Sequence, residues 1–103
     1  MIRVVAVITA KPGRRDELLA AFRANVPNVR AEQGCIEYAA HVDADGIGPF
    51  QAKFGPDAFA VLESWASPEA LSAHIGAPHM RAYGQKTKDL IANRAIHVLT
   101  AVD

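Results

Sequence analysis

The sequence predicts an α+β domain with a ferredoxin-like split βαβ arrangement built around one antiparallel sheet. Strand-like and helix-like runs follow one another in the order β-α-β-β-α-α-β. A length of 103 residues suits one domain, and a composition that is 50% hydrophobic and 21% charged can bury a core. Because there is no internal repeat, low-complexity tract or linker, residues 1–103 are expected to form a single domain.

The first strand and the first helix are expected before residue 34. Residues Ile2 to Ala10 are rich in β-branched side chains, and a Lys11-Pro12-Gly13 turn follows them. Pro27 lacks a backbone N–H and therefore predicts a kink or restart in the helix, which Gly34 is expected to close. The helix is predicted by apolar side chains spaced by four, four and three residues: Leu18, Phe22, Val26 and Val29.

Two strands are expected on either side of a long connection. Cys35 to Asp43 forms the second strand and Ala58 to Ala66 the third, and Gly, Pro and Asp residues between them indicate a loop. Phe50 and Phe54 in this loop are expected to fold back onto an apolar surface, over the chain's own pocket or over a partner subunit. The third strand carries four alternate residues on one face: Phe59, Val61, Glu63 and Trp65.

Two helices and a strand complete the chain. Ser67-Pro68-Glu69 is a helix start, with a capping hydroxyl, proline at the first helical position and a carboxylate near the positive end of the helix dipole. This helix is expected to stop near Gly76, and Arg94 to Val102 to form the last strand. Pro78 opens a further helix whose apolar stripe is predicted to contain Met80, Tyr83, Thr87, Leu90 and Ile91.

The first and last strands are apolar on both faces, which indicates burial on both sides. Helices can cover only one face of such a sheet. The other face is therefore expected to pack against a second copy of the chain, as a face-to-face homodimer.

Composition argues against several classes of partner. Eleven Lys and Arg balance eleven Asp and Glu, whereas proteins that bind nucleic acid or anionic membranes usually have a basic excess. Cys35 is the single cysteine and cannot form an internal disulfide, which fits a cytoplasmic setting. No apolar run approaches the length of about 18 residues that spans a membrane.

The chain lacks the motifs of the common cofactor sites. It has no phosphate-binding G-x-x-x-x-G-K-[ST] sequence and no G-x-S-x-G nucleophile elbow. His74 and His79 are five residues apart with Pro78 between them, and on one unbroken helix they would point about 140° apart. We therefore predict no metal site.

A pocket between the sheet and the helices is the predicted functional site. His74 and His79 are the candidate catalytic residues, because an imidazole can take a proton from an acidic phenol or an activated C–H near neutral pH. Aromatic rings would hold a flat substrate. The candidate substrate-binding residues are Trp65, Tyr83, Tyr38 and His41.

Four of these six residues also have a structural interpretation. Trp65 and Tyr83 are typical of a core, His74 of a satisfied half-buried histidine, and His79 of a group near a helix start. Glu63 lies inside an apolar strand and would be costly to bury alone, so a salt bridge with an arginine is expected.

Several motifs together resemble the antibiotic biosynthesis monooxygenase (ABM) family. They are the Lys11-Pro12-Gly13 turn, the helix end Glu32-Gln33-Gly34-Cys35-Ile36-x-Tyr38, the segment Glu63-Ser64-Trp65-Ala66-Ser67-x-Glu69-Ala70-Leu71, and the pairs Ala73-His74-Ile75 and Pro78-His79-Met80. The resemblance implies a dimeric α+β barrel, in which two sheets pack together and each leaves a pocket beneath its helices. It places Trp65 and His74 on motif residues associated with that pocket.

The family includes cofactor-independent oxygenases of quinols and anthrones, haem-degrading enzymes and a sugar-phosphate isomerase. The haem-degrading branch matches poorly, because its strand-one Asn is absent from residues 2–10 and its iron-ligating His would fall near Gly84. The resemblance therefore implies a cofactor-independent monooxygenase that oxidises a small quinol- or anthrone-type aromatic with O₂. The alternatives are a non-oxidative, isomerase-like enzyme and a non-catalytic ligand-binding dimer of the same fold.

Overall fold

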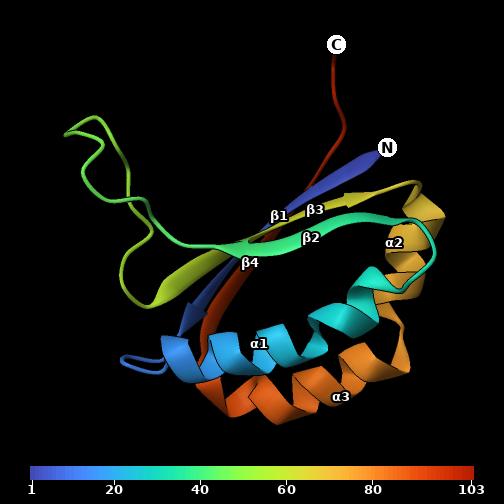
Figure 1. Cartoon of the computed structure of the whole chain (residues 1–103), viewed down its shortest axis with the longest axis horizontal. Helices are drawn as coiled ribbons and strands as arrows, with labels where there is room; N and C mark the ends of the chain where they lie inside the picture. The colour runs from blue at the N-terminus through green and yellow to red at the C-terminus, as the bar shows by residue number, and fades with distance from the viewer.

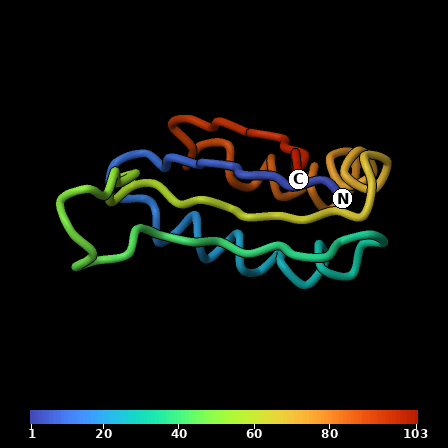
Figure 2. The backbone as a smooth tube through the Cα atoms, turned by 90° about the horizontal axis from the view of Figure 1, so that it is seen from above, coloured from blue at the N-terminus to red at the C-terminus, as the bar shows by residue number.

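The computed structural model describes all 103 residues and has four strands in one antiparallel sheet, with three α-helices on one of its faces (Figure 1). The strand order is β2-β3-β1-β4, so the first strand lies inside the sheet, and Figure 2 shows the four strands side by side. The predicted element order and fold class are confirmed. The elements are β1 (Ile2–Ala10), α1 (Arg15–Arg30), β2 (Cys35–His41), β3 (Ala58–Trp65), α2 (Pro68–Ile75), α3 (Pro78–Thr87), a short 3-10 helix (Lys88–Leu90) and β4 (Ile91–Leu99).

The core lies between the inner face of the sheet, which the helices cover, and α1. Val4 pairs with Glu63 and Val98, and Ala6 with Val61 and Ile96, so alternate residues of three strands share this face. Phe22 of α1 packs against the core residues of this face. The predicted face of β3 is confirmed, since its residues at 59, 61, 63 and 65 are all buried there.

The first helix runs through Pro27 as one element. The expected restart is wrong, because α1 is continuous from Arg15 to Arg30 and Ala31 N still donates to Pro27 O at 3.1 Å. The N–H that proline lacks would have bonded to the carbonyl oxygen of Arg23, on an exposed part of the helix where water can replace it.

Gly34 ends the segment after α1, as predicted, and its conformation admits only glycine. Its φ is +86°, and a Cβ atom built there would lie 2.6 Å from Ala70 Cβ. Gly13 has a similar φ of +76° but nothing within 4 Å of such an atom. The two glycines therefore differ in packing and not in backbone conformation.

We expect Gly34→Ala to lower the free energy of unfolding by about 2–4 kcal/mol, from backbone strain plus overpacking. Gly13→Ala carries only the strain and should cost about 1 kcal/mol. Urea denaturation of the two variants measures both values. If both variants lost the same free energy of unfolding, the close contact with Ala70 would not destabilise Gly34→Ala.

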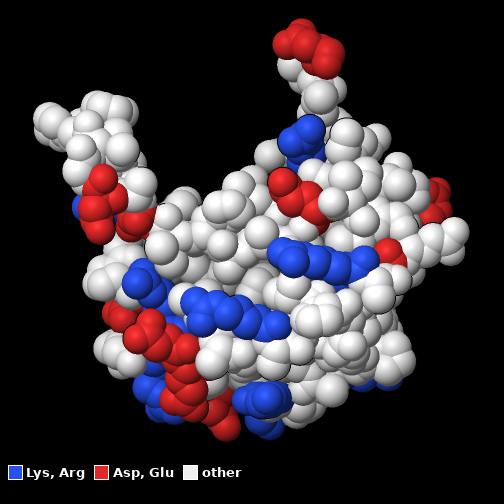
Figure 3. Space-filling model, in the orientation of Figure 1, with Lys and Arg blue, Asp and Glu red and all other residues white.

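The long connection between β2 and β3 forms an ordered arm. The Asp43 carboxylate accepts hydrogen bonds from Phe54 N at 3.0 Å and Gly55 N at 2.9 Å, and these bonds lower the pKa of Asp43. The expectation that Phe50 and Phe54 fold onto the chain's own apolar surface is wrong, because they are 81% and 55% exposed. Figures 1 and 3 show the arm and the C-terminal residues projecting on the side of the sheet opposite the helices.

The second half of the chain follows the predicted order with one shift. The Ser67 hydroxyl accepts from Ala70 N at 3.1 Å, so the predicted N-cap of α2 is confirmed. The last strand is Ile91–Leu99 and not Arg94 to Val102. The third helix ends earlier than the spacing of its apolar residues indicates. Lys11 N bonds to Leu90 O, and the backbone is already extended at Ile91.

The outer face of the sheet has no helix over it. Val5, Val7, Leu62 and Ala95 lie on this face and are half-buried by their neighbours alone. No helix of the chain is both long enough and apolar enough to cross a membrane.

Candidate functional site

A cavity of about 260 Å³ lies between the inner face of the sheet and the three helices. Twelve of its sixteen lining residues are hydrophobic, including Val4, Ala6 and Ile8 of the central strand. A cavity of about 150 Å³ is enough to hold benzene. This one therefore suits a molecule of one or two aromatic rings.

His74 is the most buried titratable side chain of the cavity wall. It lies in α2, about two turns after the Ser67 cap, and is 4% exposed. Its Nδ1 lies 2.7 Å from Glu32 Oε2. Because an ionised carboxylate only accepts, Nδ1 must carry the proton in this pair, which leaves Nε2 of a neutral imidazole with its lone pair free.

The Nε2 atom of His74 makes no hydrogen bond within the chain and is not a fully buried atom. Two aromatic rings fix the imidazole around it: Trp65, whose ring centroid is 4.6 Å away, and Tyr38, at 5.6 Å. An imidazole in this arrangement can act as a general base. A carboxylate holds one ring nitrogen, and the other is available to a ligand.

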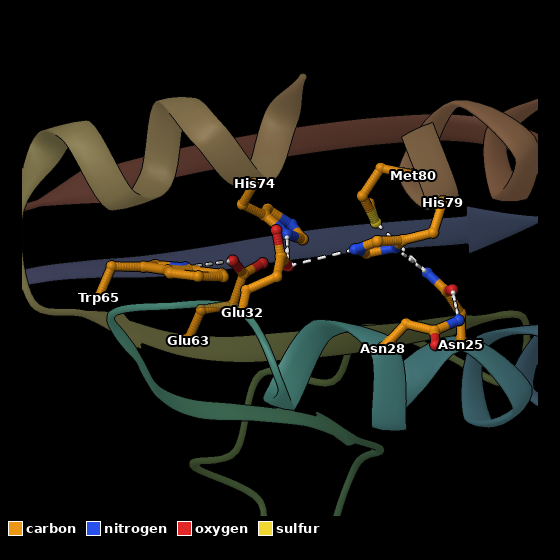
Figure 4. Close-up of polar contacts among 8 residues, drawn as sticks. All are labelled: Asn25, Asn28, Glu32, Glu63, Trp65, His74, His79 and Met80. Carbon is orange, nitrogen blue, oxygen red and sulfur yellow. Dashed lines mark hydrogen bonds and ion pairs between the residues drawn. The ribbon is translucent and has the colours of Figure 1, made fainter. Parts of the chain in front are cut away.

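Glu32 also faces a second imidazole. His79 Nε2 lies 3.6 Å from the same Oε2 atom, and Asn25 Nδ2 lies 3.3 Å from His79 Nδ1 (Figure 4). Asn28 donates to Asn25 Oδ1 at 3.0 Å, which fixes the amide with its nitrogen toward His79. The carboxylate is thus held between the histidines of two different helices.

Glu63 is the carboxylate that lines the cavity itself. Its Oε1 accepts from Trp65 Nε1 at 2.9 Å, and burial raises the pKa of Glu63 above its ordinary value. The expected salt bridge with an arginine is wrong, because the indole N–H is its hydrogen-bond partner and no ion pair forms. The pKa values of Tyr38 and Tyr83 are also raised by burial, so both phenols stay neutral.

We expect Glu63→Gln to keep the bond from Trp65, through the amide oxygen, while it removes a buried acid. Because the pKa of Glu63 is raised in the folded state, the wild type gains stability at low pH and loses it as the pH rises through that raised value. The variant should therefore become the more stable protein as pH rises, by about 1 kcal/mol at pH 8. Denaturation at pH 5 and pH 8 measures this difference, and a variant less stable at pH 8 would contradict it.

A sequence model of the antibiotic biosynthesis monooxygenase family matches residues 1–86. The chain belongs to this family. The resemblance drawn from the motifs is thereby confirmed.

No group of three or more His, Cys, Asp or Glu residues in the chain is arranged to hold a metal ion.

Relatives and solved structures agree with the family and the fold. The chain is 37% identical over 101 residues to the protein named "Probable quinol monooxygenase YgiN" of Escherichia coli K12, covering 96% of each chain. The structure of PA3566 from Pseudomonas aeruginosa has a TM-score of 0.80 at 28% identity, with 99% of this chain and 94% of that chain covered. The structure of Rv0793 from Mycobacterium tuberculosis has a TM-score of 0.80 at 29% identity, with 99% and 95% covered. Together these findings support a monooxygenase, an oxidoreductase.

In this ABM domain the six candidate residues divide into three groups. Tyr38, His74 and Tyr83 line the cavity. Trp65 is fully buried against the His74 ring and His79 faces Glu32, and neither residue is part of the cavity lining. His41 is exposed on the outer face, where its Nδ1 lies 3.1 Å from Ala39 O, and it is not part of this site.

Three residues of the site were not among the candidates named from the sequence: Glu32, which bonds to His74, and the cavity residues Arg81 and Arg94. Glu32 belongs to the family motif at the end of α1, but its partner His74 is 42 residues away and only the tertiary fold brings them together. Arg81 and Arg94 line the cavity and come from α3 and β4. His74 and His79 do not point apart as they would on one unbroken helix, because Pro78 starts a new helix and both imidazoles reach Glu32.

Proposed function

We propose that the chain is a cofactor-independent monooxygenase that oxidises a small quinol- or anthrone-type aromatic with O₂. The observation that carries the proposal is the Glu32–His74 pair on the wall of an apolar cavity of about 260 Å³. An aromatic molecule fits such a cavity, and a base on its wall can reach an acidic hydroxyl or an activated C–H.

The proposed chemistry begins with His74 Nε2 as the proton acceptor. Loss of a proton turns an anthrone or a hydroquinone into a delocalised anion, which can give an electron to O₂ directly. In an anthrone, one oxygen atom then becomes the new carbonyl, while the other leaves as water with the two hydrogens of the oxidised carbon. The substrate supplies all the electrons, so the step needs no external reductant.

Each neighbour of His74 has a proposed part in this step. Glu32 keeps the proton on Nδ1 and stabilises the imidazolium that forms, which makes it a positioning residue. Tyr38 and Tyr83 contact the substrate ring, because both line the cavity. Trp65 packs against the imidazole and holds its ring in place. His79 is the reserve base, although it does not line the cavity.

Isotope labelling tests the function itself. With ¹⁸O₂ and an anthrone, one labelled oxygen atom should appear in each product molecule, and the yield should be unchanged after chelation and dialysis. A product without label would favour a non-oxidative enzyme. No turnover of any quinol or anthrone would favour a ligand-binding dimer.

We further propose that the chain forms a homodimer through the outer face of the sheet. This apolar face has no helix over it, and the arm of residues 43–57 projects on the same side (Figure 1). Because no residue of the arm lines the cavity, Phe50 and Phe54 are expected to contact the partner subunit.

Sedimentation velocity should show a dimer for the wild type. Leu62→Glu places a charge at the centre of the outer face and should produce monomers, because a buried unpaired charge is costly. Ala20→Glu, on the exposed side of α1, is the control and should remain dimeric. A monomeric wild type at micromolar concentration would contradict the proposal.

A further inference from the structure

The mouth of the cavity carries two arginines without a carboxylate partner. Arg81 lies near the start of α3 and Arg94 on the inner face of β4, and both line the cavity. Arg81 donates to the backbone oxygen of Gly76 at 3.2 Å, and neither arginine takes part in an ion pair. Both arginines therefore belong to the lining of a cavity whose other walls are mainly apolar.

Exposure separates the mouth of the cavity from its floor. Both arginines are exposed, as are Ile96 and Val98, which share the inner face of β4 with Arg94. The floor contains the buried His74 and Glu63. A ligand that fills the cavity would thus have one end at the base and the other end among the guanidinium groups.

The charges of the cavity also differ between its two ends. Glu63 lines the floor and the Glu32 carboxylate bonds to His74 there, so the floor offers an anionic group no free guanidinium or ammonium partner. Arg94 opposes the burial-driven rise in the pKa of Tyr83, which places its charge within electrostatic reach of the phenol. An anion is therefore favoured at the mouth and disfavoured at the floor.

We propose that the substrate is an aromatic carboxylate, whose carboxylate is bound by Arg81 and Arg94 while its reacting hydroxyl points to His74. This inference rests on the proposed function, which it narrows to a substrate class. A guanidinium group offers paired N–H donors that match a carboxylate in geometry. The two arginines thereby set both the preference for the substrate and its orientation.

Two ligands that cannot be oxidised as quinols test the inference by calorimetry. The naphthalene ring of 2-naphthol fits the cavity, and 6-hydroxy-2-naphthoate adds a carboxylate at the far end from the hydroxyl. The wild type should bind the naphthoate about tenfold more tightly than the naphthol. The carboxylate can form charge-assisted hydrogen bonds with the arginines, and the naphthol has no group at that end to form them. In the double variant Arg81→Gln/Arg94→Gln this ratio should fall to near one. Arg23→Gln, on the exposed face of α1, is the matched control and should keep the ratio.

Three results would overturn the inference: equal affinity of the wild type for both ligands, a preference that survives in the double variant, or no binding of either ligand. Oxidation of a neutral quinol by the same preparation separates this inference from the proposed function. If oxidation proceeds without a carboxylate preference, only the substrate class is wrong. If the preference holds and no quinol or anthrone is oxidised, the binding site stands and the proposed reaction is wrong.

Discussion

Replacing His74 with alanine is expected to lower the turnover of a quinol or anthrone by about 10²-fold or more. A positioned general base contributes about 10²–10⁴-fold to a proton transfer. His74 is the only histidine on the cavity wall, and Glu32 already fixes its protonated nitrogen. The loss should therefore appear in the rate at saturating substrate, measured by oxygen uptake in a sealed cell.

Two controls separate the chemistry from folding. Added imidazole should restore part of the rate in His74→Ala, because the variant leaves space for it beside Glu32. His41→Ala removes an exposed imidazole from the outer face and should keep the rate. A near-normal rate for His74→Ala would remove His74 from the role of base.

Replacing Glu32 with glutamine is expected to lower the rate by about 10²-fold, because the carboxylate orients the base and stabilises its charged form. The amide can also turn its NH₂ group toward His74 Nδ1 and so favour the wrong tautomer. The pH profile provides the decisive readout. Without the anion the imidazolium is less stable, so the rise of activity with pH should begin at a lower pH and reach a lower plateau.

Glu17→Gln is the matched control, since Glu17 lies on the exposed side of α1 and pairs only with Arg14. This variant should keep both the rate and the pH profile. If Glu32→Gln lost activity with an unshifted profile, stabilisation of the imidazolium would not be part of the role of Glu32, and the loss would come from orientation or folding. Comparison of unfolding free energies in the same buffers would then locate the loss.

Local signals in the sequence predicted most elements of the fold. Ser67 and Pro68 define the start of α2 by themselves, because a capping hydroxyl and a first-turn proline act within a few residues. The end of α3 could not be placed in this way. Leu90 and Ile91 continue the apolar spacing of the helix, and only pairing with β1 shows that Ile91 begins a strand.

The candidate site was predictable to the extent that it depends on alternation and helical spacing. Tyr38, His74 and Tyr83 follow from such patterns and do line the cavity. Tyr38 and His41 are three residues apart in a strand, so alternation places their side chains on opposite faces of the sheet. The sequence pattern itself was therefore inconsistent with a pocket that contains both. Glu32 could not be paired with His74 from the sequence, because their contact depends on how α1 and α2 pack over the sheet.

Oxygen consumption by the metal-stripped protein, with a panel of hydroquinones and anthrones and with His74→Ala beside it, tests whether the chain is a cofactor-independent oxygenase with His74 as its base. We expect uptake that requires the folded protein, persists without metal and falls at least about 10²-fold in the variant. Uptake no faster than autoxidation for every substrate of the panel would contradict it.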